Sequence, residues 1–153
     1  KERVWITTPY FVPGPAILNA LGTAALSGVD VRVIIPSTKD HFLVFWASRG
    51  NIEPMLRAGV RIFLYEKGFV HTKSVLADDG ICSVGTCNMD VRCLEVHFDN
   101  RLCIYGKALN SSCADRFLRD IEDSGELDVS EWEERPLRKK LLESFGRLYS
   151  AQI

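Results

Sequence analysis

The first 65 residues of this 153-residue chain alternate between strand-like and helix-like patterns, and this alternation constrains the fold more than any other feature. Short apolar segments that end at proline or glycine alternate with longer segments that have a helical spacing of apolar residues. The predicted strands are 4–7, 29–35 and 60–65, and the predicted helices are 15–26 and one or two within 40–58. Such an order is typical of parallel strands joined by helices that cover the sheet. The sequence therefore predicts an α/β fold.

The second half of the chain has a different pattern. Strand-like segments at 70–76, 81–85 and 96–105 have short connections, and Asp79-Gly80 is a strong hairpin signal. A helical period follows over 107–121, Ser124-Gly125 interrupts it, and a last helix is predicted over 136–149, with Leu137, Leu141, Phe145 and Leu148 on one stripe. We expect a mixed, largely parallel central sheet with helices on both faces. We also expect a single domain over residues 1–153, with a C-terminal helix at 135–150.

Composition limits the classes of function. A net charge of −1 argues against affinity gained by neutralising many phosphates, so no nucleic acid partner is expected. No apolar run approaches the ~20 residues of a transmembrane helix. The five cysteines are odd in number and lack Cys-x-x-Cys spacing, which predicts reduced thiols in a cytoplasmic setting and no metal site. The chain begins abruptly in a predicted strand, without a targeting signal, which suggests a piece of a longer protein.

The residues that carry chemistry lie around residue 71. On a strand, His71 and Lys73 point to the same side, so an imidazole and an ammonium can converge on one ligand. This pair suits a phosphate, because a neutral imidazole can attack phosphorus while Lys73 and the Asn88 amide stabilise charge on the oxygens. Asp78, at the end of this predicted strand, is better placed to hold the turn than to contact a substrate.

The spacing of these residues resembles the signature of the phospholipase D superfamily. The chain has His71-x-Lys73-x4-Asp78, followed by Gly85-Thr86-x-Asn88. The resemblance implies that His71, Lys73 and Asp78 form the catalytic motif, with His71 as the nucleophile of a phosphohistidine intermediate. It also implies that Lys73, Thr86 and Asn88 bind the substrate phosphate, with Thr86 where the family usually has serine. Asp99 falls where many members carry a glutamate that orients the nucleophile imidazole.

Segments outside the motif, namely 8–13, 31–36 and 135–149, resemble the second half of bacterial cardiolipin synthases. The resemblance implies transfer of a phosphatidyl group between two phosphatidylglycerol molecules, giving cardiolipin and glycerol without a cofactor. Its implied partners are the phospholipid substrate, a membrane surface, and a second motif from a missing N-terminal half or from a second copy of the chain. The intact protein would lie at the bacterial cell membrane with this domain on the cytoplasmic side. The fragment itself would be soluble and inactive as a monomer.

Two other functions remain open. A phosphodiesterase or nuclease of the same fold can complete its site by pairing two identical chains, and one motif in about 150 residues permits this. A half that only binds phosphate or lipid is the second alternative.

Several residues have two readings that the sequence leaves open. The aromatic residues Tyr10 and Phe11 line the substrate entrance or simply pack, and Phe42, Phe45 and Trp46 contact lipid or the core. The last helix, with Lys139, Lys140 and Arg147, is an interfacial element or a solvated face. His97 approaches the site or is structural.

Overall fold

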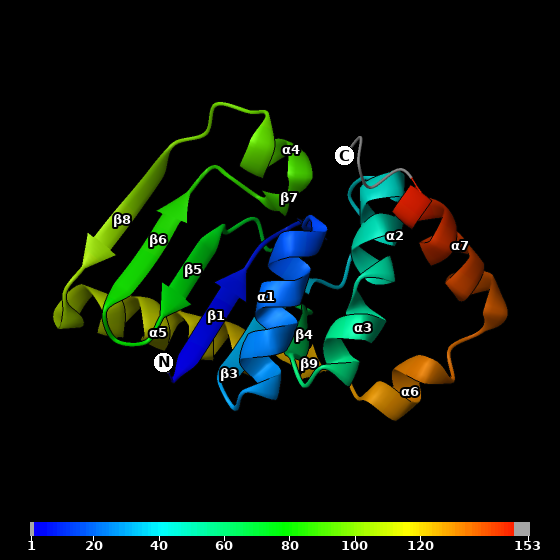
Figure 1. Ribbon diagram of the computed structural model, residues 1–153, viewed down its shortest axis with the longest axis horizontal. Helices are drawn as coiled ribbons and strands as arrows, with labels where there is room; N and C mark the ends of the chain where they lie inside the picture. The colour runs from blue at the N-terminus through cyan, green and yellow to red at the C-terminus, as the bar shows by residue number, and fades with distance from the viewer. Residues whose placement is uncertain (1, 149–153) are drawn as a thin grey trace.

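The computed structural model describes residues 2–148 (Figure 1). In it, the alternating first part of the chain forms three neighbouring parallel strands. They are β1 (Arg3–Thr7), β3 (Asp30–Pro36) and β4 (Arg61–Tyr65), and the connecting helices are α1 (Pro15–Leu26), α2 (Phe42–Gly50) and α3 (Ile52–Arg57). Helix α1 begins at a proline, whose missing N–H is not needed in the first turn, and ends just before Gly28, which adopts a φ of 85°. These elements confirm the predicted alternation.

The rest of the chain adds strands on both sides of this parallel unit. The elements are β5 (Ser74–Ala77), β6 (Ile81–Gly85), α4 (Val91–Glu95), β8 (Arg101–Tyr105), α5 (Lys107–Glu122), β9 (Ser124–Glu126), α6 (Val129–Glu133) and α7 (Leu137–Leu148). A separate two-stranded pair joins β2 (Phe11–Val12) to β7 (Met89–Asp90). The last helix confirms the prediction for 136–149 as far as it is described, because Tyr149 and residue 150 lie outside the described residues.

The seven-stranded sheet has the order β8-β6-β5-β1-β3-β4-β9 within the described part of the chain. The predicted mixed α/β class is confirmed, but the expectation of a largely parallel sheet is wrong. Only the pairs β1–β3 and β3–β4 are parallel, and the other four pairs are antiparallel. The tight turn at residues 78–80 accounts for the antiparallel pair β5–β6, since parallel strands need a long crossover. The pairs β1–β5 and β4–β9 instead join segments that are distant in the sequence.

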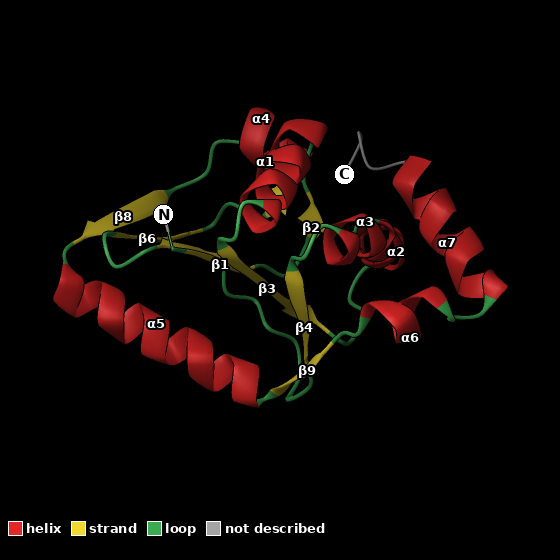
Figure 2. Ribbon diagram, turned by 60° about the horizontal axis from the view of Figure 1, so that its bottom comes forward, coloured by secondary structure: helices red, strands yellow, loops and turns green. Residues whose placement is uncertain are grey.

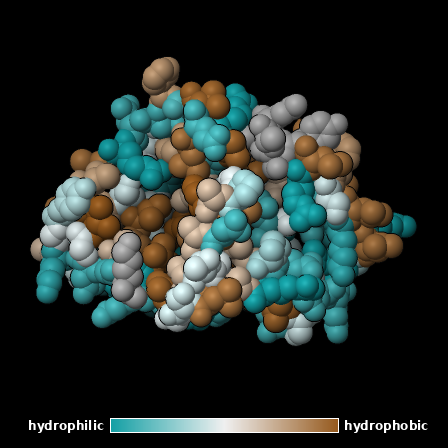
Figure 3. All heavy atoms as spheres, in the orientation of Figure 1, coloured by the Kyte–Doolittle hydropathy of each residue, from teal (hydrophilic) through white to brown (hydrophobic). Residues whose placement is uncertain are grey.

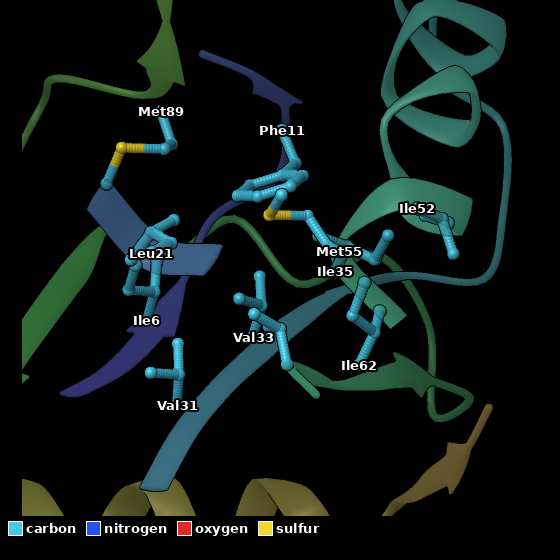
Figure 4. Packing of buried hydrophobic residues seen from close by; sticks show 11 residues of the cluster. Ile6, Phe11, Leu21, Val31, Val33, Ile35, Ile52, Met55, Ile62 and Met89 are labelled. Carbon is cyan, nitrogen blue, oxygen red and sulfur yellow. The ribbon is translucent and has the colours of Figure 1, made fainter. Parts of the chain in front are cut away.

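Helices cover both faces of the sheet, as expected (Figure 2). On one face, α1 and α3 pack on a cluster that includes Ile6, Val33 and Met55 (Figure 4). On the other face, α5 packs on a cluster that includes Trp5, and the ring of Trp5 stacks on Phe117 with centroids 5.0 Å apart. Neighbouring residues of one strand thus enter opposite cores, which follows from the two-residue period of a strand.

Two predicted strands begin later than expected. The segment 70–73 leaves the sheet because its neighbour β1 ends opposite Ser74 and continues into Pro9, which has no N–H for a ladder. The segment 96–100 is likewise irregular, since the N–H groups of Val96 and His97 donate to the Arg92 carbonyl and close α4. Both irregular segments lie at the same end of the sheet.

None of the helices within residues 2–148 combines the length and apolar character needed to cross a bilayer.

Candidate active site

The candidate site lies where four strand ends meet. The antiparallel pairing of β5 with β1 sets the residues before Ser74 beside the carboxyl end of β1. The pairing of β6 with β8 brings Gly85 opposite Arg101, and the Gly85 N–H donates to the Lys73 carbonyl at 3.1 Å. The two halves of the motif, which are separate in sequence, therefore come together at one end of the sheet.

His71 and Lys73 are adjacent, as their spacing predicts, although they precede the strand rather than belong to it. The Lys73 ammonium is 3.2 Å from both imidazole nitrogens of His71 and donates to the His71 carbonyl at 2.9 Å. Equal distances to both nitrogens mean that the ammonium lies against the ring face rather than on one lone pair. The imidazole is exposed, with its other neighbour Phe69 at a centroid distance of 5.9 Å, so a phosphate can reach it.

Lys73 is half-buried, and burial lowers its pKa below the ordinary value of 10.5. The negative charges of Asp99 and Asp90 oppose this effect, but they do not outweigh it. Burial disfavours an unneutralised charge, so a bound anion such as a phosphate would stabilise the ammonium. The electrostatics of Lys73 therefore favour an anionic ligand beside His71.

Gly85 and Thr86 lie close against the following strand. A Cβ atom at Gly85 would clash with the carbonyl oxygen of Asn100 and lie 2.9 Å from the Cα of Arg101, so only glycine allows this approach. The Thr86 hydroxyl accepts from the Asn100 N–H at 3.0 Å and donates to Oδ1 of Asp99 at 2.5 Å. Its one proton is thus directed at Asp99, and a phosphate would have to compete for it.

Asn88 presents an amide that is only weakly engaged. Its Nδ2 contacts Sγ of Cys93 at 3.5 Å, a weak acceptor, and its Oδ1 is buried without a hydrogen-bond partner among residues 2–148. Cys93 is a neighbour that the sequence reasoning missed. The available signal was Asp90, which caps α4 by accepting from the Cys93 N–H at 2.7 Å and so directs this helix at the site. Burial raises the pKa of the Cys93 thiol to about 11, so this thiol stays protonated at neutral pH.

Asp99 was predicted to orient the His71 imidazole, and the structure brings it to Thr86 instead. Its Oδ1 accepts the Thr86 hydroxyl, and its Oδ2 is buried without a hydrogen-bond partner in the described part of the chain. Direct orientation of the imidazole therefore remains a prediction.

Asp78 lies at the opposite end of β5 from His71. Its Oδ1 accepts from the backbone N–H groups of Glu2 and Arg3, and its own backbone has a φ of 52° in the turn to β6. The four residues of β5 lie between it and Lys73, so the two residues are five steps, or about 17 Å, apart in extended chain. These contacts match the turn-holding role that its position suggested.

His97 lies near the site, and its surroundings bear on metal binding. Ligand atoms of Cys93, His97 and Asp99 all lie within 4.8 Å of one another. However, the Arg92 guanidinium contacts Nε2 of His97 at 3.2 Å, and a guanidinium can only donate hydrogen bonds. Nε2 must then be the acceptor, which puts the proton of a neutral ring on Nδ1, the nitrogen that faces Cys93. This arrangement does not favour a cation there.

A series of aromatic rings runs away from His71. Phe69 is followed by Tyr10 at a centroid distance of 6.5 Å and by His41 at 6.4 Å from Tyr10. The Tyr10 hydroxyl donates to Asp40 at 2.7 Å, and burial together with this bond raises the pKa of Tyr10 to about 12. Tyr10 thus faces the site, whereas Phe11 is fully buried in the core.

Comparisons with known proteins agree with this geometry. Residues 1–121 match the family model described as "Cardiolipin synthase, PLD-like domain", where PLD denotes phospholipase D. A cardiolipin synthase of Clostridium perfringens is 42% identical over 98% of this chain, and one of Geobacillus thermodenitrificans is 40% identical over 98%. The chain spans about a third of the length of these relatives, 32% and 30%.

Two solved structures share the fold. The phosphatidylserine synthase of Haemophilus influenzae superimposes with a TM-score of 0.76 at 19% identity, covering 99% of this chain and 40% of that chain. The phospholipase D family member Nuc of Salmonella typhimurium gives a TM-score of 0.72 at 18% identity, covering 83% and 82%. Together with the sequence match, these findings assign the chain: it belongs to the family of phospholipase D-like domains of cardiolipin synthases.

Proposed function

We propose that this chain is one catalytic half, the C-terminal one, of a phosphatidyltransferase that makes cardiolipin from two phosphatidylglycerol molecules. The observation that carries the proposal is the exposed imidazole of His71 with the Lys73 ammonium 3.2 Å from its nitrogens, in a member of this family. A nucleophile and a phosphate-binding cation are thus already adjacent. Residues 1–153 would act as a single domain in that protein.

In the proposed reaction, a ring nitrogen of His71 attacks the phosphorus of phosphatidylglycerol, and the bond from phosphorus to the glycerol oxygen breaks. Glycerol leaves with a proton from a general acid, and a phosphatidyl-histidine remains. The hydroxyl of a second phosphatidylglycerol loses its proton to the same group and attacks this phosphorus, which releases His71 and cardiolipin. The reaction conserves electrons throughout and needs no redox cofactor.

Lys73 and Asn88 would hold the phosphate oxygens during both steps. The ammonium lies against the ring face and can rotate onto a non-bridging oxygen, while the weakly held Asn88 amide can donate to another. Such preorganised donors stabilise charge that develops in the transition state. Thr86 and Asp99 would help to position Lys73 and Asn88, and Asp78 would maintain the turn at the far end of β5.

The general acid would come from a second copy of the motif. The chain contains one such motif, and it spans only about a third of its relatives. The proposed partner is therefore the N-terminal half of the parent protein, or a second copy of this chain. Support for a protein partner here comes from Val96 and Phe98, which are highly exposed beside Asp99. The parent protein would act at the cytoplasmic side of the bacterial cell membrane.

One observation favours a second candidate function, a phosphodiesterase or nuclease that acts as a homodimer. The match to the Salmonella family member Nuc covers 83% of this chain and 82% of Nuc, so the superfamily includes a chain of about this size. Salt-sensitive DNA cleavage by a dimer of this chain, without phosphatidyl transfer, would favour this function.

Phosphatidyl transfer from phosphatidylglycerol vesicles, measured with the parent protein and with this chain, tests the proposal. The His71→Ala parent should lose at least about a thousandfold in rate, because the nucleophile itself is removed. The matched control is His97→Ala, which removes an exposed imidazole close to the site that is held by Arg92, and should change the rate only a few-fold.

The mass of this chain in solution decides how the result with the chain alone is read. A folded monomer should be inactive, whereas a dimer that loses activity with His71→Ala would mean that two identical halves can rebuild the site. A parent protein that transfers phosphatidyl groups equally well with and without His71 would overturn the proposal.

A further inference from the structure

The apolar stripe of α7 faces away from the protein. Leu137, Leu141 and Leu148 are 71%, 62% and 80% exposed, and Phe145 of the same stripe is 48% exposed. Figure 3 shows apolar atoms along the edge of the molecule that α7 forms. At 3.6 residues per turn, these four residues share one face of a 12-residue helix. An amphipathic helix normally turns its apolar face to the core. The outward direction of this face on α7 must therefore be explained by what packs on its inward side.

The inward face of α7 consists of small and paired groups. Gly146 lies so close to α2 that a Cβ atom there would be 2.5 Å from the Ala47 nitrogen. Glu143, 3% exposed, is bound by the Arg135 guanidinium, which also reaches Glu53 at 2.9 Å. The Gly146 contact holds α7 against α2, and the Arg135 network connects it to Glu53 of α3. With this side packed inward, the apolar face of α7 points outward.

The charges that border the apolar stripe have one sign. On the helical wheel Arg138 lies on one side of the stripe and Lys140 and Arg147 lie on the other, while Lys139 is on the side of Gly146. The single acidic residue of α7 is the buried Glu143. An exposed face of leucines bordered only by cations is complementary to an anionic lipid surface, where the apolar residues enter the acyl boundary and the cations meet headgroup phosphates.

The position of α7 connects this face to the active site. Helices α2 and α7 run antiparallel, since Gly50 lies beside Glu143 and Ala47 beside Gly146. The C-terminal end of α7 therefore lies at the start of α2, on the side of the molecule that carries β7 and α4 (Figure 1). Phe42 begins α2 and is 55% exposed, and the preceding His41 belongs to the ring series that leads to His71.

We infer that α7 is the membrane-docking helix of this domain, which inserts its Leu137–Leu141–Leu148 stripe into an anionic phospholipid surface and holds the His71 end of the sheet at the headgroups. The inference deepens the proposed function, on which its choice of lipid rests. The second exposed apolar group, around Val96 and Phe98, has mixed charges nearby and suits a protein partner instead.

Flotation of the chain with vesicles tests the inference. The probes are vesicles of phosphatidylcholine alone and of phosphatidylcholine mixed with phosphatidylglycerol. The chain should bind the mixed vesicles, and less so at high salt. The double variant Leu137→Ser/Leu141→Ser should bind at least about tenfold more weakly, because two leucine side chains that would enter the lipid are lost. The charge variant Arg138→Gln/Lys140→Gln should weaken binding to the mixed vesicles only.

Each variant has a matched control away from α7. Leu26→Ser removes a leucine of α1 that is 76% exposed, and Lys107→Gln/Arg119→Gln removes two exposed cations of α5. Both controls should bind like the unmodified chain. Equal unfolding midpoints in urea confirm that the α7 variants are folded.

Three results would overturn the inference: no binding to the mixed vesicles, equal binding by the α7 leucine variant, or self-association through the stripe without lipid binding. The test is independent of catalysis, because His71→Ala should float like the unmodified chain. Binding through α7 together with a parent protein that lacks transferase activity would refute the proposed function and leave the membrane-docking helix standing. Transferase activity together with equal binding by the leucine variant would do the reverse.

Discussion

The Thr86 hydroxyl donates a 2.5 Å hydrogen bond to Oδ1 of Asp99, and it accepts the Asn100 N–H at the same time. This bond connects the motif half that follows β6 to the segment that precedes β8. It gives Asp99 a partner other than the imidazole that the family resemblance implies. Asp99 would then act on the site through Thr86, as a positioning residue.

Replacing Asp99 by alanine in the parent protein should therefore slow phosphatidyl transfer by about 10- to 100-fold without abolishing it. A loss of this size is common for residues that act through another residue of the site. Thr86→Val should cause a similar loss, because it removes the same bond, whereas Thr86→Ser should keep most of the activity. The rates of the two single variants and of the double variant are measured together.

If Asp99 acts through Thr86, the double variant should be little worse than either single variant, since the shared interaction is lost only once. A loss with Asp99→Ala as complete as that with His71→Ala would contradict this role and favour direct contact with the nucleophile.

The lowered pKa of Lys73 predicts a pH dependence of stability. Burial lowers the pKa in the folded state, while the unfolded chain has the ordinary value of 10.5. Between these two values the unfolded state binds more protons, so the free energy of unfolding rises with pH in that window. Lys73→Met should raise the urea midpoint at neutral pH and remove this rise.

Lys67→Met is the control of opposite sign. The hydrogen bond to Asp123 raises the pKa of Lys67, so its contribution is complete below 10.5 and disappears as pH rises through the folded-state value. This variant should remove a fall in stability at alkaline pH. Identical pH profiles for both variants would show that neither lysine has the assigned environment.

Arg135 is the central residue of the network that holds α7. It binds Glu143 through two nitrogens at 2.6–3.0 Å, and Glu143 is 3% exposed. Arg135→Met should reduce the free energy of unfolding by about 3–5 kcal/mol, because it leaves a buried carboxylate without its partner. Arg61→Met, in a more exposed pair with Glu126, should cost less than about 1 kcal/mol. Urea unfolding curves of the two variants compare these values.

Gly146 determines how closely α7 approaches α2. A Cβ atom there would lie 2.5 Å from the Ala47 nitrogen and 2.7 Å from the Trp46 carbonyl carbon. Gly146→Ala should therefore destabilise the fold by about 1–3 kcal/mol, although alanine favours helices elsewhere. At Gly80 a Cβ atom would meet no atom within 4 Å, so Gly80→Ala serves as the control. A Gly146→Ala variant as stable as the control would refute the close contact.

The sequence allowed much of the local structure to be predicted, because short-range patterns carry it. The bounds of α1 follow from Pro15 and Gly28. Asp79-Gly80 marked the position of the β5–β6 hairpin, although Asp78 and not Gly80 takes the positive φ of its turn. The adjacency of His71 and Lys73 follows from a separation of two residues in extended backbone. The side chains of His71 and Lys73 lie on the same side, as expected, even though the strand begins only at Ser74.

Tertiary structure decided the features that depend on contacts between distant segments. The balance of parallel and antiparallel pairs depends on which strands meet, which no local period encodes. The partner of Asp99 depends on the pairing of β6 with β8, which brings Thr86 within reach. The stripe on α7 was visible in the sequence, but its outward direction was not. A helical period shows that one face is apolar, whereas the closest packing, here Gly146 against Ala47, decides which face turns inward.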